Sequence, residues 1–461
     1  MRPGLFLSDE HRAGGPQAPR RRPTGQRRPT LAPERALTYQ ARKRGGARMP
    51  LLVMKFGGTS VATLDRIRRA AKRVGREVAN GHDVIVVVSA MAGETNRLVG
   101  FVEETSPFFD AREYDAVVAS GENVTAGLMA LTLQEMDIPA RSWQGWQVPL
   151  RTNSAHAAAR IEDIPTDNIL AKFAEGMKVA VVAGFQGISP EGRITTLGRG
   201  GSDTTAVAFA AAFGAVRCDI YTDVDGVYTT DPRITDKARR LDRIAFEEML
   251  ELASLGAKVL QTRSVELAMR YKVRLRVLSS FEDEIGEGSG TLVCDEEDIM
   301  ESNVVAGVAF SRDEAKMTLT EVEDRPGIAA AIFGPLSEAG VNVDMIVQNI
   351  SDAGLTDMTF SCPVGQVARA ERAMNEAREK GEVAFRTLVA DTEVAKVSVV
   401  GIGMRSHAGV AAQMFKALRD ENINIKVITT SEIKISVLID RKYMELAVQA
   451  LHDAFGLERA E

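Results

Sequence analysis

The stretch Thr195-Thr-Leu-Gly-Arg-Gly-Gly-Ser-Asp-Thr-Thr205 leads into an unbroken run of small and apolar residues that reaches Phe213. This run predicts a buried helix, because it is apolar on every helical face. Ser202 or Asp203 is expected to cap the helix N-terminus. The free N–H groups of such a helix end favour an anion, and Arg199 adds a guanidinium suited to a carboxylate or phosphate. The sequence therefore predicts an anion site here; the alternative is a glycine turn that only caps a core helix.

Apolar strands and helices alternate on both sides of this loop. Strands are expected at residues 51–56, 84–88, 179–183 and 275–278, and helices at 64–78, 116–136, 246–253 and 258–270. This alternation predicts a three-layer α/β/α fold with an open, mostly parallel sheet. In such sheets ligands bind beyond the carboxyl ends of the strands. The polar and glycine-rich motifs of the chain fall there.

Composition places the chain among ordinary globular proteins. It has 461 residues, of which 45% are hydrophobic and 26% charged, which suggests two to four domains. No apolar run is long enough to predict a membrane span. The three cysteines are far apart and form no metal or disulfide pattern, so we expect buried thiols in a reducing cytoplasm.

The first 48 residues differ from the rest. They hold 12 Lys and Arg against 3 Asp and Glu, a net +9, so the chain's total of −6 leaves −15 for the remainder. The acidic body argues against nucleic-acid binding. The segment has no hydrophobic period and no secretory signal, so we expect a disordered or non-native extension that ends near Met49. An organellar transit peptide is the alternative.

The C-terminal third contains an internal repeat. Lys316-Met-Thr-Leu-Thr320, Gly327, Phe333 and Val341-Asn-Val343 recur as Lys396-Val-Ser-Val-Val400, Gly409, Phe415 and Ile423-Asn-Ile425. Each copy predicts a βαββαβ module. The acidic, turn-rich residues 281–303 are expected to be a linker. The predicted domains are an extension (1–48), a catalytic domain (49–280), the linker, and modules at 304–390 and 391–461.

Lys55 stands between an apolar strand and a Gly-Gly turn. It is a candidate cation for a phosphate; the alternative is a strand-end lysine that reaches solvent. The chain lacks the Gly-x-x-x-x-Gly-Lys-Ser/Thr pattern of P-loop proteins and the His-Arg-Asp and Asp-Phe-Gly motifs of protein kinases. A phosphate site here would therefore belong to another class of phosphotransferase.

Six motifs together resemble the aspartate kinases of the amino-acid kinase superfamily. They are Lys55-Phe-Gly-Gly-Thr-Ser60, Ser89-Ala-Met91, Ser120-Gly-Glu122, Gly184-Phe-Gln-Gly187, Thr196-Leu-Gly-Arg-Gly-Gly-Ser-Asp203 and Tyr221-Thr-Asp-Val-Asp-Gly-Val-Tyr-Thr-Thr-Asp-Pro-Arg233. The repeat resembles a tandem pair of ACT domains, so the resemblance runs from about Met49 to the C-terminus. It implies the reaction ATP + L-aspartate → ADP + 4-phospho-L-aspartate, the first step toward lysine, threonine and methionine.

The chemistry of this reaction suits the residues present. The attacking carboxylate is already ionised at neutral pH, so no general base is required. The site must instead bring two anions together and stabilise charge on the transferring phosphoryl group. Lysine, glycine-loop N–H groups and Mg²⁺ can do this, and the resemblance implies that Mg²⁺ is held mainly by the nucleotide phosphates, without a metal site of the protein's own.

The resemblance also assigns roles. Lys55 would bridge the transferring phosphate, Asp203 would orient the active-site lysines or the metal-bound nucleotide, and Arg199 would hold the α-carboxylate of aspartate. Glu122 would hold its α-ammonium. The implied aspartate-binding set is Thr95, Glu122, Arg199, Gly200, Gly201 and Ser202. The implied ATP-binding set is Lys55, Phe56, Gly57, Gly58, Ser89, Tyr221, Thr222, Asp223, Val227, Tyr228, Arg233 and Lys258.

The ACT resemblance implies feedback inhibition by lysine and/or threonine, and oligomerisation through the repeats. The implied effector-binding set is Asp324, Gly327, Ile328, Ala329, Asn342, Asp344 and Gln348; the alternative is a turn plus a packing surface. An internal start near Met300 could also give a shorter regulatory subunit. Two other functions stay open: another kinase of the superfamily, acting on glutamate, acetylglutamate, carbamate or a nucleoside monophosphate, and a non-catalytic amino-acid sensor.

Overall fold

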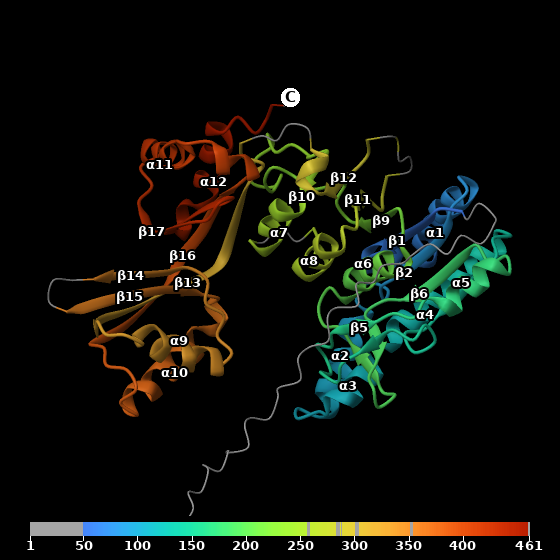
Figure 1. Ribbon diagram of the computed structural model, residues 1–461, viewed down its shortest axis with the longest axis horizontal. Helices are drawn as coiled ribbons and strands as arrows, with labels where there is room; N and C mark the ends of the chain where they lie inside the picture. Colours follow the sequence, from blue (N-terminus) through green and yellow to red (C-terminus); the bar gives the residue numbers. More distant parts are fainter. Residues whose placement is uncertain are drawn as a thin grey trace, which may run out of the picture. The chain divides into compact units, whose positions relative to one another are not determined.

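The computed structural model describes residues 49–255, 259–282, 286, 288–299, 304–350 and 354–459 (Figure 1). The predicted extension 1–48 and the predicted nucleotide ligand Lys258 lie outside these residues. Two sheets with their helices make up most of the described chain, one before and one after residue 304.

The first sheet has eight strands in the order β10-β12-β11-β9-β1-β2-β6-β3. Their bounds are β1 (Leu51–Phe56), β2 (Asp83–Val88), β3 (Ala140–Trp143), β6 (Val179–Ala183), β9 (Arg217–Thr222), β10 (Arg243–Ala245), β11 (Leu275–Ser279) and β12 (Thr291–Cys294). The pairs are parallel except β11 with β12. The predicted parallel sheet is therefore confirmed, but β12 is a sheet strand within the segment expected to be a linker.

Helices cover both faces of this sheet. Their bounds are α1 (Leu64–Ala79), α2 (Glu94–Thr105), α3 (Ala111–Val118), α4 (Ser120–Glu135), α5 (Asp167–Ala174), α6 (Gly201–Phe213), α7 (Phe246–Ser254) and α8 (Thr262–Tyr271). Alternate strand residues face two separate cores: Leu52 packs with α1 and α4, whereas Val53 packs with α5 to α8. This is the layered arrangement that buried parallel strands require.

Two predicted helix boundaries are wrong. The helix expected at 116–136 is two helices, α3 and α4, which meet at Ala119. The cap expected at Ser202 or Asp203 is instead Gly200, which has φ +73 and precedes the first helical residue, Gly201. Glycine adopts this left-handed conformation without steric cost. Because Gly200 ends the loop, Ser202 and Asp203 lie in the first helical turn and their side chains are available for other contacts.

A small four-stranded sheet leads into the glycine loop. Its order is β5-β4-β7-β8, and its bounds are β4 (Arg151–Thr152), β5 (Ile161–Asp163), β7 (Gln186–Ile188) and β8 (Ile194–Thr196). β7 and β8 form an antiparallel hairpin. The loop therefore starts from the end of a paired strand and ends at a buried helix, which fixes both of its ends.

The second sheet is antiparallel, with the order β14-β15-β13-β16-β18-β17. Its strands and helices are β13 (Gly307–Glu323), α9 (Ile328–Glu338), β14 (Ile346–Ile350), β15 (Leu355–Cys362), α10 (Val367–Glu379), β16 (Thr387–Val400), α11 (Val410–Asp420), β17 (Ile425–Thr430), β18 (Lys434–Asp440) and α12 (Met444–Ala454). Figure 1 shows α9 beside α10 and α11 beside α12, as their contacts require. Val305 and Val308 pack in the core beneath α11 and α12. The start of the segment 304–390, which was predicted to belong to the first module, therefore packs with the second.

One described helical run, Ala111–Glu135, is long and apolar enough by composition to cross a membrane. This run comprises α3 and α4, and half of it is buried inside the fold. Met129 and Leu133 of α4 are fully buried in the core beneath the large sheet. A core helix meets the same length and composition criteria, so the run is weak evidence for a membrane span.

Candidate active site

Lys55 and Asp203 form a buried ion pair at the carboxyl edge of the large sheet. Lys55 is the fifth of the six residues of β1, and Asp203 lies in the first turn of α6. The Nζ atom of Lys55 is 2.5 Å from Oδ1 of Asp203, and their side chains are 10% and 11% exposed. A buried ammonium is retained only with such a partner. The structure therefore does not support the alternative of a lysine that reaches solvent.

The turn after β1 leaves space beside this lysine. A Cβ added to Gly57 would lie 3.4 Å from Nζ of Lys55, and one added to Gly58 would lie 3.0 Å from the carbonyl oxygen of Ala90. The backbone N–H of Gly57 donates to the carbonyl of Tyr221 at 3.2 Å, which holds the turn against β9. Because the two glycines add no side chain next to the cation, a phosphate has room to approach it.

Glu122 is a buried carboxyl group with one unused oxygen. It lies in the first turn of α4 and is 3% exposed. The N–H of Ala90 donates to its Oε1 at 3.0 Å, while Oε2 has no hydrogen-bond partner among the described residues. Burial raises the pKa of Glu122 to about 7. A buried polar atom without a protein partner needs a ligand group, an ion or an ordered water to complete it.

Ser202 brings the glycine loop close to two strand ends. A Cβ added to Gly184, just after β6, would lie 2.9 Å from the Ser202 side chain and 2.9 Å from the carbonyl of Val88 at the end of β2. Ser89 follows Val88, and its N–H donates to the carbonyl of Phe56 at 3.1 Å. The predicted motifs at 89–91, 184–187 and 196–203 therefore meet at one edge of the sheet.

Arg199 and Thr95, two predicted aspartate-binding residues, are less buried than Glu122 and Ser202. The Arg199 side chain is exposed and makes no hydrogen bond or ion pair with another described residue. Thr95 is half-buried in the first turn of α2. Gln261 packs on the loop so closely that a Cβ on Gly200 would clash with it. Arg199 thus lies on a loop that Gln261 packs against, and it has no partner among the described residues.

The loop 221–233, expected to hold ATP, is partly supporting structure. The Tyr221 ring is buried and stacks on Phe56 with 4.7 Å between ring centroids. Thr222 ends β9, where its hydroxyl donates to the exposed Asp223 at 3.2 Å. The Tyr221 side chain therefore supports the site by packing on Phe56. The side chains of Thr222 and Asp223 lie nearer to solvent, where a nucleotide could reach them.

Further along the same loop, Val227 is buried, and the Tyr228 hydroxyl donates to a carboxylate oxygen of Asp225 at 3.0 Å. Arg233 is exposed and pairs with Asp231 at 2.6 Å. The backbone N–H of Arg233 also donates to Asp231 at 2.9 Å, which is the turn contact that aspartate commonly makes. Arg233 would have to exchange this partner to contact a nucleotide.

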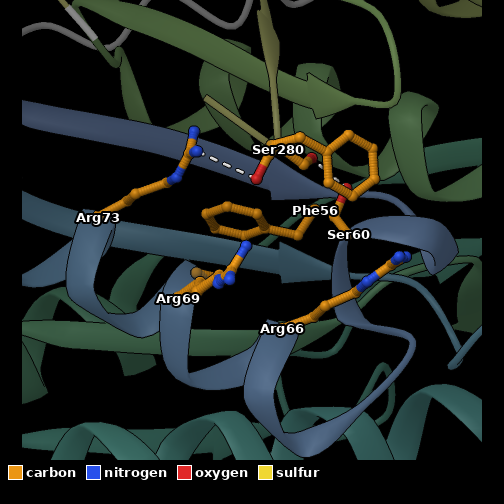
Figure 2. A pocket seen from close by; sticks show the side chains of 8 residues that line it. Phe56, Ser60, Arg66, Arg69, Arg73 and Ser280 are labelled. Atoms are coloured by element: carbon orange, nitrogen blue, oxygen red, sulfur yellow. Dashed lines mark hydrogen bonds between the residues drawn. The ribbon is translucent and has the colours of Figure 1, made fainter. Parts of the chain in front are cut away.

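Three arginines of α1 support the edge of the site, and the sequence did not assign them a role. Figure 2 shows Arg69 and Arg73 extending from successive turns toward Phe56 and Ser280, while the Arg66 guanidinium lies over the Phe281 ring, 4.9 Å from its centroid. Arg73 is buried and donates to the carbonyls of Ser279 at 2.7 Å and Ser280 at 3.0 Å. The cavity among them holds about 10 Å³, one water at most. Their regular spacing on one helical face was the available signal.

The ACT region places the predicted effector residues in two segments. Asp324, Gly327, Ile328 and Ala329 lie where β13 passes into α9, with Gly327 at φ +90. Asn342 and Asp344 precede β14, and Gln348 lies within it. Asp344 pairs with the buried Lys396, which also pairs with Glu314 at 2.7 Å. Lys396 and Glu314 were not identified from the sequence, although Lys396 is the repeat counterpart of Lys316.

The two halves are joined by buried polar contacts. Glu248 of α7 is 3% exposed and accepts from the N–H of Ile402 at 2.9 Å. Thr229 Oγ1 lies 2.9 Å from Nε2 of His452 in α12, and the Thr229 carbonyl accepts from the N–H of Val308 at 2.8 Å. The loop that contains the predicted nucleotide residues is thus bonded to the ACT region.

The chain matches the amino acid kinase family over residues 50–279 and ACT domains over residues 316–382 and 397–455. It is 54% identical to the aspartate kinase of Stutzerimonas stutzeri over 411 residues, which are 89% of this chain and 98% of that protein. It is 46% identical to the aspartokinase of Helicobacter pylori, covering 89% of this chain and all of that protein.

A solved structure is similar over nearly the same length. The structure of E. coli aspartokinase III in complex with aspartate and ADP has a TM-score of 0.73 and 29% identity, covering 88% of this chain and 99% of that one. Sequence, domain order and fold agree over most of the chain. The chain therefore belongs to the aspartate kinase family, enzymes in which an amino acid kinase domain is followed by ACT domains.

Proposed function

We propose that the enzyme transfers the γ-phosphoryl group of ATP to the side-chain carboxylate of L-aspartate, with Glu122 as the group that selects a free amino acid. The unused, buried Oε2 of Glu122 carries this proposal. An α-ammonium would supply the missing partner and favour the ionised carboxylate. Acetylglutamate and carbamate have no ammonium, so they would leave this oxygen unpaired. E. coli aspartokinase III has been solved with aspartate and ADP, which supports the same substrate pair.

Lys55 would stabilise the charge that develops on the transferring phosphoryl group, with Asp203 holding its ammonium in position. The pair is buried, so it acts where water screens little. Arg199 would bind the α-carboxylate of aspartate, helped by Ser202 and Thr95. Its guanidinium is exposed and unpaired within residues that the structure describes, which fits a group that binds an anionic substrate. The substrate carboxylate is already ionised, so no base is needed.

The site fits ATP bound together with Mg²⁺. Gly57 and Gly58 leave room for phosphates beside Lys55. Within the described ranges, no group of three or more His, Cys, Asp or Glu side chains could hold a metal ion. Mg²⁺ commonly binds through substrate phosphates and one or two carboxylates, so the nucleotide would carry the ion. Mg²⁺ would neutralise phosphate charge during transfer.

We further propose that lysine and/or threonine inhibit the enzyme by binding at the ACT region. E. coli aspartokinase III, solved with lysine and aspartate, has a TM-score of 0.70 and 28% identity to this chain. An effector must bind two states of the enzyme with different affinity. Thr229 belongs to the loop 221–233 and contacts Val308 and His452 of the ACT region. A change of state in the ACT region could therefore alter this loop. The remaining parts of this proposal are a role at the start of lysine, threonine and methionine synthesis, a cytoplasmic location, and assembly into a homo-oligomer or with a shorter regulatory subunit.

One assay tests both halves. Acyl phosphate is trapped as hydroxamate with ATP, Mg²⁺ and aspartate, glutamate or N-acetylglutamate, each alone and with lysine, threonine or both. We expect product from aspartate, at least a hundredfold less from the other acceptors, and inhibition by one effector or by the pair. Preference for N-acetylglutamate would contradict the role of Glu122. Full aspartate activity with no response to either amino acid would contradict only the feedback proposal, and no product from any acceptor would favour a non-catalytic sensor.

A further inference from the structure

A fully buried carboxylate lies outside the set of residues assigned to substrate or nucleotide. Asp115 of α3 is 0% exposed. Its Oδ2 lies 2.7 Å from Nδ1 of His156, and its Oδ1 accepts from the Thr196 hydroxyl at 2.5 Å. The backbone N–H of Ala157 donates to both oxygens at 3.1 and 3.2 Å. Burying a carboxylate is costly unless it is hydrogen-bonded, and these donors offset that cost, so Asp115 and its partners hold one another in place.

Asp115 connects the first residue of the glycine loop with the segment that lies beneath the loop. Thr196 is the last residue of β8 and the first of the loop that contains Arg199. Ala157 belongs to the segment beneath that loop, because a Cβ on Gly198 would lie 3.2 Å from the Ala157 carbonyl. Ala157 has φ +63, which is unfavourable for an alanine and persists only where its surroundings enforce it. Asp115 therefore fixes the base of the loop from a third element.

A second long-range contact holds the next residue. Arg263 of α8 donates to the carbonyl of Leu197 and to that of Ala159, both at 2.9 Å. The N–H of Ala159 in turn donates to the Thr196 carbonyl at 2.9 Å. The loop is thus attached at Thr196 and Leu197, while Arg199, two residues after Leu197, is exposed and has no partner in the part of the chain that the structure describes. These contacts restrict the position of the Arg199 guanidinium in the absence of substrate.

We propose that Asp115 is a positioning residue for aspartate binding: through the Thr196 hydroxyl and the Ala157 N–H it holds the glycine loop in the conformation that presents Arg199. This inference rests on the proposed contact of Arg199 with the substrate carboxylate. Asp115 is fully buried, so it would act through the loop rather than by contact with a substrate. A displacement of about 1 Å in a binding group can reduce turnover about a hundredfold, so loss of this support should be visible in kinetics.

The chain provides a matched pair of variants. Thr195 and Thr196 are adjacent residues of β8, and both are fully buried. The Thr196 hydroxyl binds Asp115, whereas the Thr195 hydroxyl lies 2.6 Å from that of Thr152, away from the loop. Thr196→Val and Thr195→Val each remove one buried hydroxyl at constant shape. A role confined to stability would affect the two variants alike.

The experiment measures KM for aspartate, KM for ATP, kcat and the thermal midpoint of both variants, with Thr196→Ser and Arg199→Ala in the same series. We expect Thr196→Val to raise KM for aspartate at least fivefold with KM for ATP within twofold of wild type. Thr195→Val should leave both values within twofold, and Thr196→Ser, which keeps a hydroxyl, should restore KM for aspartate. Asp115→Asn, which removes the carboxylate from the other side of the bond, should show the same selective rise.

Four results would overturn the inference. If Thr196→Val and Asp115→Asn lower the thermal midpoint without a selective change in KM for aspartate, Asp115 is only structural. If Thr195→Val raises KM for aspartate as much as Thr196→Val, the effect is not specific to the loop. If Arg199→Ala itself leaves KM for aspartate unchanged, the substrate contact fails and the route through Arg199 fails with it. A rise in Arg199→Ala without one in Thr196→Val overturns the positioning role alone.

Discussion

The Nζ atom of Lys55 lies 2.5 Å from Oδ1 of Asp203, and both side chains are about nine-tenths buried. One belongs to the first strand of the large sheet and the other to the first turn of the helix after the glycine loop. An ion pair thus connects the motif 55–60 with the motif 196–203. Asp203 keeps the ammonium in place beside the Gly57–Gly58 turn while no phosphate is bound, because a buried cation without a partner is strongly unfavourable.

Replacing Lys55 separates its catalytic and structural roles. Lys55→Ala should lower kcat at least a hundredfold, since one charge stabiliser at the reacting group typically contributes two to three decades. It should also lower the thermal midpoint, because Asp203 is left buried and unpaired. The double variant Lys55→Ala/Asp203→Asn should recover much of the stability and none of the turnover. A Lys55→Ala enzyme with more than about a tenth of wild-type kcat would contradict the assignment.

Arg199→Ala should act on aspartate binding alone. The side chain is exposed and has no partner among the described residues, so its loss should not change the thermal midpoint. Hydrogen bonds to charged groups contribute about 1.5 to 3 kcal/mol, so KM for aspartate should rise about ten- to a hundredfold while KM for ATP changes little. Arg193→Ala, at another exposed arginine, is the control and should leave both constants unchanged. Equal increases in the two KM values would count against the carboxylate contact.

Glu122 predicts a pH dependence of aspartate binding. Burial raises its pKa to about 7, so below that pH an increasing fraction is protonated and cannot pair with an ammonium. kcat/KM for aspartate should therefore rise with pH up to about 7 and then level off. In Glu122→Gln this rise should disappear, and kcat/KM should lie below wild type above pH 7. A wild-type profile that is flat between pH 5.5 and 7.5 would argue against this role.

The same carboxyl group should reduce stability when it is ionised. Its folded-state pKa lies above the unfolded value of 4.5, so its contribution to the unfolding free energy falls as pH rises from about 4.5 to 7. Each pKa unit corresponds to about 1.4 kcal/mol, so a pKa raised from 4.5 to about 7 should make Glu122→Gln more stable than wild type by about 3 to 4 kcal/mol at pH 8. The two proteins should be equally stable near pH 4.5. Urea unfolding at both pH values measures this, and a Gln variant less stable at pH 8 would oppose it.

The motifs and the main strands could be predicted because their signals are local. β1, β2 and β6 are unbroken apolar runs, which two-sided burial requires, and the resemblance rested on residues that follow those strands. The predicted cap of α6 was wrong because two good capping residues, Ser202 and Asp203, lie only two and three residues after the true cap, Gly200. Only the ion pair with Lys55 shows why Asp203 is inside the helix rather than before it.

Other features depend on contacts between distant residues. β12 is four residues long and follows an acidic, turn-rich segment, so nothing local separates it from a linker. It reaches β11 through Gly290, where a Cβ would lie 2.1 Å from the Val277 carbonyl. The break at Ala119 contains no glycine or proline, and it separates two helices of continuous apolar composition. Asp115 was not noticed, because its partners Thr196 and His156 lie far along the chain.

His452 predicts how the two halves of the enzyme respond to pH and to an effector. It is fully buried, its Nε2 faces the hydroxyl of Thr229, and its Nδ1 has no partner among the described residues. Burial lowers its pKa below 6.5. The protonated form is therefore disfavoured in the folded state. The contribution of His452 to the unfolding free energy is fully present above about pH 6.5 and decreases as pH falls below it. His452→Gln should abolish this loss between pH 6.5 and 5.5, as followed by the thermal midpoint, whereas His407→Gln, at an exposed histidine, should retain it.

The His452→Gln enzyme should also need a higher effector concentration for half-inhibition, because its link to the loop 221–233 is weakened. Unchanged pH dependence together with unchanged inhibition would show that this contact is not used for coupling.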